Sequence, residues 1–117
     1  MAKDMFRERG RAEEEAYFRR RGFKVLALEG LGIETDSDMA RVAPEYLAEF
    51  VKSVDRPDAE AIFLSCGALR ALDIVEPLER ELGKPVIASN AAMMWDCLRL
   101  AGVEDRRAGF GRLLAGG

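Results

Sequence analysis

The stretch AIFLSCGALRALDIVEPLERELG, residues 61–83, decides the fold. Its first four residues are all apolar, which is typical of a short strand that is buried on both faces, as in a parallel sheet. After the Ser-Cys-Gly turn at residues 65–67, apolar residues recur at steps of three and four, and this spacing makes one stripe of a helix. The stripe consists of Leu69, Leu72, Val75, Leu78 and Leu82. The stretch therefore predicts a strand, a turn and an amphipathic helix.

Cys66 lies where this predicted strand ends and the helix begins. In open α/β sheets, ligands bind at the carboxyl ends of the strands. A helix N-terminus also offers unpaired N–H groups and a partial positive charge, which favour a thiolate over a thiol. Gly67 leaves room for a ligand to approach the backbone closely. The residues alone leave two interpretations open, a reactive thiol and a buried structural cysteine, and free cysteines are commonly buried.

Two more apolar runs, on either side of the central stretch, predict strands. Residues 23–28 (FKVLAL) follow a charged helix that is expected to end before Gly22, and residues 86–88 follow a helix stop at Gly83. Residues 44–54 (PEYLAEFVKSV) predict a helix with proline in its first turn. Strands and helices thus alternate, so we expect an α/β protein with a short parallel sheet in a three-layer α/β/α arrangement.

Ser89 and Asn90 follow the predicted strand at residues 86–88, at a second carboxyl end. Asn90 can cap the helix that begins there or direct its amide to a ligand, and capping is the more ordinary role. The helix carries apolar residues that we expect in the core or in an interface: Met93, Trp95, Cys97, Leu98 and Leu100. Cys97 itself is expected to be a small buried hydrophobic residue.

The composition excludes several classes of function. The chain has 117 residues, which is one small domain, and a net charge of -3 with both signs interspersed, so no nucleic-acid partner is expected. It contains no histidine, which removes histidine-based triads and histidine-ligated zinc. No GxGxxG or Walker-type motif is present, so no dinucleotide site is expected, and no long apolar run is present, so no membrane contact is expected. The expected location is the cytoplasm, where both cysteines stay reduced.

Several segments together resemble one known family. They are the Ser-Cys-Gly turn, PVIASN at residues 85–90, the tryptophan-containing helix after it, and GFGRLL at residues 109–114. These resemble the Asp/Glu racemase superfamily, in the branch of arylmalonate decarboxylases and maleate cis-trans isomerases. Residues 19–45 (RRRGFKVLALEGLGIETDSDMARVAPE) are similar to the same branch, so the resemblance extends from about residue 11 to the end.

The resemblance implies an enzyme of two similar α/β lobes, with the active site between them. Residues 1–117 correspond to one Rossmann-like lobe, the second. Family members act on small carboxylates or dicarboxylates, and the resemblance implies that no metal and no organic cofactor is needed. The reaction can be racemisation, isomerisation or decarboxylation, and these three stay open here. The family's second-lobe cysteine matches Cys66, which is implied as the catalytic thiol. Gly67, Ser65 and Asn90 are implied to bind the substrate.

The chain departs from the family pattern at its start. In the family, the second lobe opens with a strand and a Thr-Pro-Tyr-like turn, whereas this chain begins with MAKDMFRERG. The missing strand belongs between residues 23–28 and 61–64, and such a gap exposes two strand edges that invite pairing. We therefore expect a homo-oligomer or a separate first-lobe chain as partner. The alternative function is a catalytically incomplete fragment or a self-associating binding module.

Overall fold

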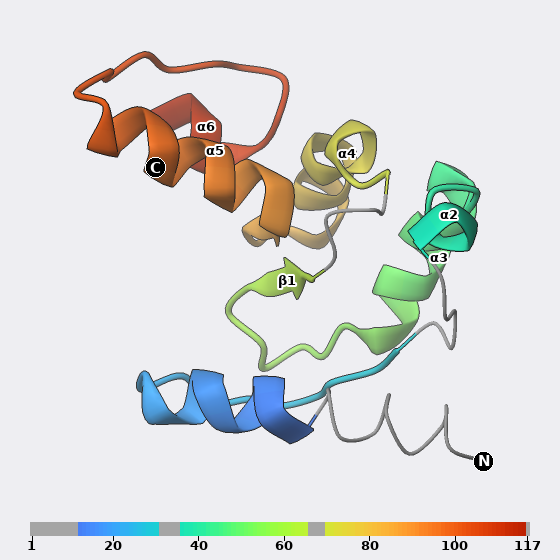
Figure 1. Ribbon diagram of the computed structural model, residues 1–117. Coiled ribbons are helices and arrows are strands. Elements are labelled where there is room, and N and C mark those ends of the chain that lie inside the picture. The colour runs from blue at the N-terminus through green and yellow to red at the C-terminus, as the bar shows by residue number, and fades with distance from the viewer. Residues whose placement is uncertain (1–11, 31–35, 66–69, 117) are drawn as a thin grey trace.

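Two short parallel strands lie at the centre of the fold, which a computed structural model describes over residues 12–30, 36–65 and 70–116 (Figure 1). Residues 12–20 are helical, and the elements that follow are α2 (Asp36–Met39), α3 (Pro44–Val54), β1 (Ile62–Leu64), α4 (Leu72–Leu82), β2 (Val86–Ala88), α5 (Ser89–Leu100) and α6 (Arg112–Gly116). None of the helices within these ranges is long and apolar enough to cross a membrane.

The strands pair in the predicted parallel sense. Ile62 is opposite Val86 and Leu64 is opposite Ala88 in the register of β1 and β2. Parallel neighbours need a crossover connection, and α4 supplies it between the two strands. The predicted strand–turn–helix pattern of the central stretch is therefore confirmed for the strand and the helix. The turn at residues 66–69 lies outside the described residues.

α4 provides the largest part of the core because its apolar residues share one face. Ile74, Val75 and Leu78 are buried, and they pack with α3, β2 and the start of α5. The other core residues are Leu47, Val51, Ala71, Val86, Ala88 and Ala91. Gly83 ends α4 in a left-handed conformation with φ of 70°, and its N–H donates to the carbonyl of Glu79 at 2.9 Å. This helix stop agrees with the sequence-based prediction.

Helices lie on both sides of the two strands, which confirms the three-layer α/β/α expectation. α4 and α5 lie on one side, and the helical residues 12–20 lie on the other (Figure 1). The rings of Phe18 and Phe63 meet edge to face with centroids 5.3 Å apart, so this helix contacts β1 through aromatic packing. Residues 12–20 end before Gly22, as predicted, and Gly22 has a φ of 92°.

The predicted strand at residues 23–28 is wrong. These residues have no secondary structure and no place in the sheet, which contains β1 and β2 within the described ranges. The carbonyl of Leu26 accepts a hydrogen bond from Nη1 of Arg56 at 3.2 Å, and that of Val25 accepts one from Nη2 of Arg19 at 3.4 Å. Arginine side chains thus take the acceptors that a neighbouring strand would use. A strand needs such a neighbour, and apolar composition does not provide one.

A buried carboxylate and a largely buried ion pair join the elements. Glu79 is 6% exposed, and its carboxylate accepts hydrogen bonds from the backbone N–H groups of Val86 at 3.0 Å and Arg112 at 2.8 Å. It therefore links α4 to β2 and to α6. Lys84 pairs with Asp55 at 2.8 Å while both side chains are largely buried, and this pair joins the end of α3 to the start of β2.

Candidate functional site at the carboxyl edge of the sheet

The parallel register brings the ends of both strands to one edge. Leu64 and Ala88 form the last paired position, so the next residues, Ser65 and Ser89, emerge side by side. Ser65 is exposed, and Asn90 is exposed one residue after Ser89. Ser65 and Asn90, both predicted as site residues, are thus brought to the same edge. Cys66 and Gly67 lie outside the described residues and follow Ser65 directly in the chain.

Asn90 does not cap α5. The N-cap position is Ala88, which makes no side-chain capping bond, and α5 begins at Ser89. Asn90 is therefore the second residue of the helix, and the capping interpretation is wrong. The side-chain amide of Asn90 therefore belongs to the first turn of α5, where backbone N–H groups have no partner within the helix. The edge thus combines an amide side chain with the amino-terminal end of α5.

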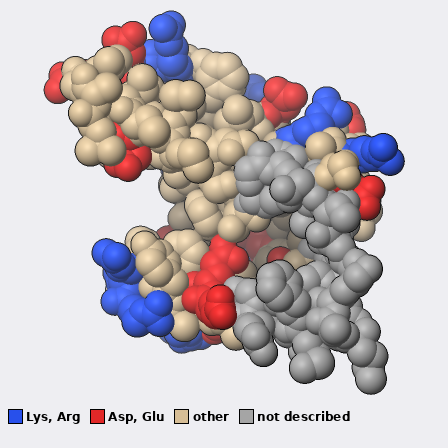
Figure 2. All heavy atoms as spheres, in the orientation of Figure 1, with Lys and Arg blue, Asp and Glu red and all other residues tan. Residues whose placement is uncertain are grey.

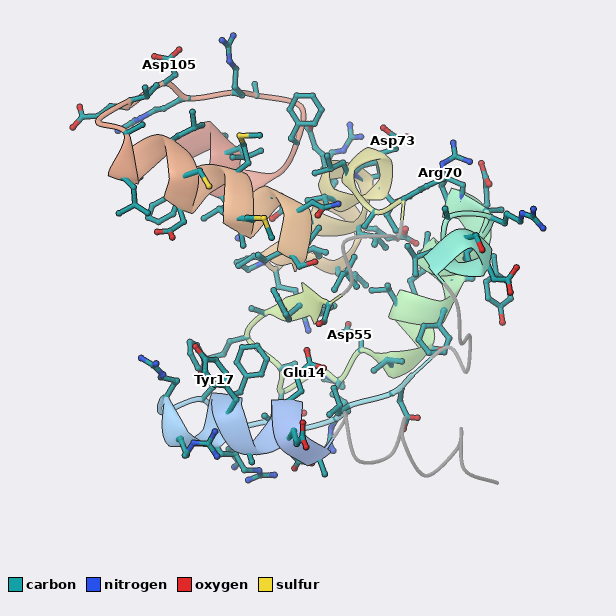
Figure 3. The ribbon with its side chains drawn as sticks, viewed as in Figure 1. Glu14, Tyr17, Asp55, Arg70, Asp73 and Asp105 are labelled. Carbon is teal, nitrogen blue, oxygen red and sulfur yellow. The ribbon has the colours of Figure 1, made fainter. Side chains whose placement is uncertain are left out.

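A cavity of about 680 Å³ opens between α3 and α4. It is lined by Arg41, Ala43, Pro44, Glu45, Ala48, Arg70, Asp73 and Ile74. The residues from α3 and α4 belong to the first or second turns of these helices. A helix that connects parallel strands starts at their carboxyl edge, so the α4 side of the cavity lies at that edge. Arg70 and Asp73 mark the start of α4 in Figure 3.

The cavity carries charges of both signs. Arg41 and Arg70 supply two guanidinium groups, while Glu45 and Asp73 supply two carboxylates. Within the described part of the chain, none of these four side chains makes an ion pair. Figure 2 shows basic and acidic side chains side by side over α2 and α4. A guanidinium binds a carboxylate with two parallel hydrogen bonds, which is the contact that Arg41 and Arg70 can offer to a ligand, while Glu45 and Asp73 balance their charge.

Arg70 and Arg41 were not predicted as site residues. Arg70 stands four positions after Cys66 and just before α4, so its place next to the turn was a usable signal. Arg41 carries no such signal, because it reaches the cavity only through the packing of α3 on α4. Cys97 was expected to be buried, and this is wrong: it is an exposed free thiol on α5.

The fold and this edge define a class of protein. It is an α/β domain whose parallel sheet carries polar side chains and a neighbouring cavity at its carboxyl edge, and one of these polar residues, Ser65, directly precedes a cysteine in the sequence. A model of the arylmalonate decarboxylase family matches residues 6–114. The chain therefore belongs to the arylmalonate decarboxylase family, as the resemblance implied.

Three similar proteins show the extent of the match. Arylmalonate decarboxylase of Bordetella bronchiseptica is 44% identical over 86 residues, which are 71% of this chain and 36% of the relative. A crystal structure of arylmalonate decarboxylase superposes with a TM-score of 0.76 at 37% identity, covering 85% of this chain and 45% of the other. A cysteine-to-serine variant of Nocardia farcinica maleate cis-trans isomerase, with a covalently bound succinylcysteine intermediate, has a TM-score of 0.80 at 27% identity, covering 86% and 42%. The chain thus spans less than half the length of these relatives.

Proposed function

We propose that the chain is one lobe of a cofactor-independent enzyme that acts on a small carboxylate or dicarboxylate through the thiol of Cys66. The observation that carries the proposal is the pairing of Leu64 with Ala88, because this register brings Ser65 and Asn90 to one edge. Cys66 is the next residue after Ser65. The succinylcysteine in a similar maleate isomerase supports cysteine chemistry in this fold.

Decarboxylation of an arylmalonate is the favoured reaction. In sequence alignments the identity to arylmalonate decarboxylase of Bordetella bronchiseptica is 44%, against 28% to maleate isomerase of Nocardia farcinica. In this reaction the bond between the central carbon and one carboxylate breaks and carbon dioxide leaves. The bonding electron pair stays on the central carbon, conjugated with the second carboxylate. The S–H bond of Cys66 then breaks, its proton moves to that carbon, and its electron pair remains on sulfur as a thiolate. Water returns a proton to the thiolate.

The residues at the edge suit the charge that this reaction develops. Negative charge accumulates on the oxygens of the remaining carboxylate, and preorganised N–H donors at the start of a helix stabilise such charge. The amide of Asn90 and the backbone at Gly67 are the proposed donors, and Ser65 supports the turn. Arg70 in the neighbouring cavity adds a positive charge that attracts a dianionic substrate. A helix N-terminus and a positive charge beside a thiol favour the thiolate, which is the form that the proton transfer leaves on sulfur.

The test is turnover by the purified chain with phenylmalonate, followed as release of carbon dioxide. Cys66→Ser is expected to lower the rate by about 100-fold or more, because it replaces the thiol by a hydroxyl, which is a far weaker acid. Cys97→Ser is the matched control and is expected to keep the rate, since Cys97 lies on the exposed side of α5. Equal rates for Cys66→Ser and the unaltered chain overturn the proposal. Formation of fumarate from maleate in the same samples decides between decarboxylation and isomerisation.

The second candidate function is a catalytically incomplete lobe that associates with itself. It is favoured by the sheet, which within the described residues contains β1 and β2, so that each strand has an edge open to pairing with another chain. A folded chain that turns over neither substrate and forms dimers supports this candidate. Turnover by a monomer contradicts it. In either case we propose a reducing, cytoplasmic setting, in which both cysteines remain thiols.

A further inference from the structure

A second cavity lies near the end of α5, where the loop that follows this helix turns back to α6. Its volume is about 360 Å³, and it is lined by Trp95, Arg99, Glu104, Arg106 and Gly116. Figure 1 shows how the chain leaves α5, runs through this loop and returns beside the same helix as α6. Asn90 lies near the other end of α5, about 13 Å from Arg99 at the rise of an α-helix. The cavity is therefore separate from the edge that holds Ser65 and Asn90.

Backbone hydrogen bonds hold the walls of this cavity in place. The N–H of Val103 donates to the carbonyl of Leu98 at 2.8 Å, which ties the loop to α5. The N–H of Arg107 donates to the carbonyl of Leu114 at 2.6 Å, which ties the loop to α6. Nη1 of Arg99 in turn donates to the carbonyl of Val103 at 2.9 Å. Because these bonds already order the loop, a ligand does not have to order it on binding.

Positive charge is in excess in this cavity. Arg99 and Arg106 supply two guanidinium groups, whereas Glu104 supplies one carboxylate. Among the residues that the structure describes, the side chains of Arg106 and Glu104 have no ion pair and no hydrogen bond. A guanidinium carries several N–H donors, so Arg99 keeps most of its donors after the bond to Val103. The excess charge and the unused donors together suit an anion with oxygen acceptors.

Trp95 adds a donor that has no partner. Its Nε1 is buried and makes no hydrogen bond within the described part of the chain. Buried donors are nearly always paired, and an unpaired one calls for an explanation such as a bound ion or water. The guanidinium of Arg99 lies over the ring of Trp95, with its central carbon 5.2 Å from the ring centroid. An anion held by Arg99 therefore lies close to the indole and changes its environment.

We propose that this cavity binds a small oxyanion, whose carboxylate or phosphate group lies between the guanidinium groups of Arg99 and Arg106. Carboxylates and phosphates share this chemistry, because both offer a pair of oxygen atoms to the planar fork of a guanidinium. Glu104 offsets one of the two positive charges, so one positive charge remains for the ligand. The inference does not depend on the proposed enzymatic function, since none of the lining residues belongs to the carboxyl edge of the sheet.

Tryptophan fluorescence tests the proposal, because Trp95 is the only tryptophan of the chain. Titration with malonate or with inorganic phosphate is expected to give a saturating change, and sodium chloride at the same ionic strength is expected to give none. The anion that saturates at the lower concentration identifies the preferred group. Arg106→Gln is expected to raise the dissociation constant at least about tenfold, because it removes a bidentate partner. Arg107→Gln is the matched control: it loses the same charge one residue outside the cavity and is expected to bind as before.

The variants also decide where the anion binds. Arg106 is exposed, so Arg106→Gln is expected to fold normally, and circular dichroism checks this. The absence of a saturating change with either anion overturns the proposal, as does an Arg106→Gln variant that binds as tightly as the unaltered chain. Binding that Arg70→Gln weakens and Arg106→Gln does not places the anion at the carboxyl edge, which overturns the proposal. Equal weakening in Arg106→Gln and Arg107→Gln shows attraction by net charge alone and overturns it as well.

Discussion

A methyl group at Gly111 is expected to disrupt the contact between α6 and α4. Gly111 is buried just before α6, and its φ is 97°, a left-handed conformation that favours glycine. A Cβ atom built there overlaps Cγ1 of Val75 and lies 3.1 Å from Oε1 of Glu79. Val75 is 1% exposed and therefore has no room to move aside. The carboxylate of Glu79 is held by its two backbone donors and cannot move without losing them.

Two costs add in Gly111→Ala. The left-handed backbone costs an alanine about 1–2 kcal/mol. Forcing an extra methyl group into a closely packed site costs a further ~1–3 kcal/mol. The free energy of unfolding is therefore expected to fall by about 2–5 kcal/mol, which is a large part of the stability of a small domain. Gly102 isolates the first cost, because its φ is 76° and a Cβ atom there meets nothing within 4 Å.

Urea denaturation of both variants measures the difference. With a slope of about 1–2 kcal/mol per molar, Gly111→Ala is expected to lower the transition midpoint by at least about 1 M. Gly102→Ala is expected to lose only the backbone cost of about 1–2 kcal/mol. Equal destabilisation of the two variants would show that the contact with α4 is not tight, and it would refute the packing of α6 described above.

Three further substitutions test other contacts. Glu79→Gln is expected to lower the free energy of unfolding by about 1–3 kcal/mol in urea denaturation, because an amide nitrogen cannot accept a hydrogen bond from a backbone N–H. An unchanged transition midpoint contradicts the hydrogen bonds of Glu79 to β2 and α6. Lys84→Met is expected to destabilise the chain more than Arg107→Met. Loss of the Lys84 side chain leaves Asp55 unpaired in a largely buried place, whereas Arg107 forms an exposed ion pair worth at most about 1 kcal/mol. The reverse order of stability in thermal unfolding contradicts this expectation. Arg70→Gln is expected to weaken binding of phenylmalonate in calorimetry, and unchanged affinity excludes Arg70 from the site.

Patterns within a single segment predicted the centre of the fold. The four apolar residues at 61–64 and the apolar spacing after them identified β1 and α4, because both depend on local periodicity and burial. Gly22 and Gly83 were correct helix stops for the same reason, since a left-handed residue is a local requirement. The edge that holds Ser65 and Asn90 followed from the order of strands and helices alone.

The failures depend on distant partners. Residues 23–28 have the composition of a strand, but pairing requires a neighbour, and two arginines take the carbonyl groups instead. Cys97 was expected to be buried because a free cysteine usually behaves as a small hydrophobic residue, but the sequence does not say which side of α5 faces inward. Arg41 reaches the cavity through the packing of α3 on α4, which no pattern around Arg41 reveals.

Alkylation of the two cysteines tests most directly whether Cys66 faces a site for a small carboxylate. The unaltered chain is treated with iodoacetamide in the presence and absence of phenylmalonate, and the labelling rates of Cys66 and Cys97 are followed by peptide mass spectrometry. Cys97 is the internal control, because it is exposed on α5. We predict that phenylmalonate slows the labelling of Cys66 and leaves that of Cys97 unchanged. Equal rates at Cys66 with and without phenylmalonate would contradict a carboxylate site at this edge of the sheet.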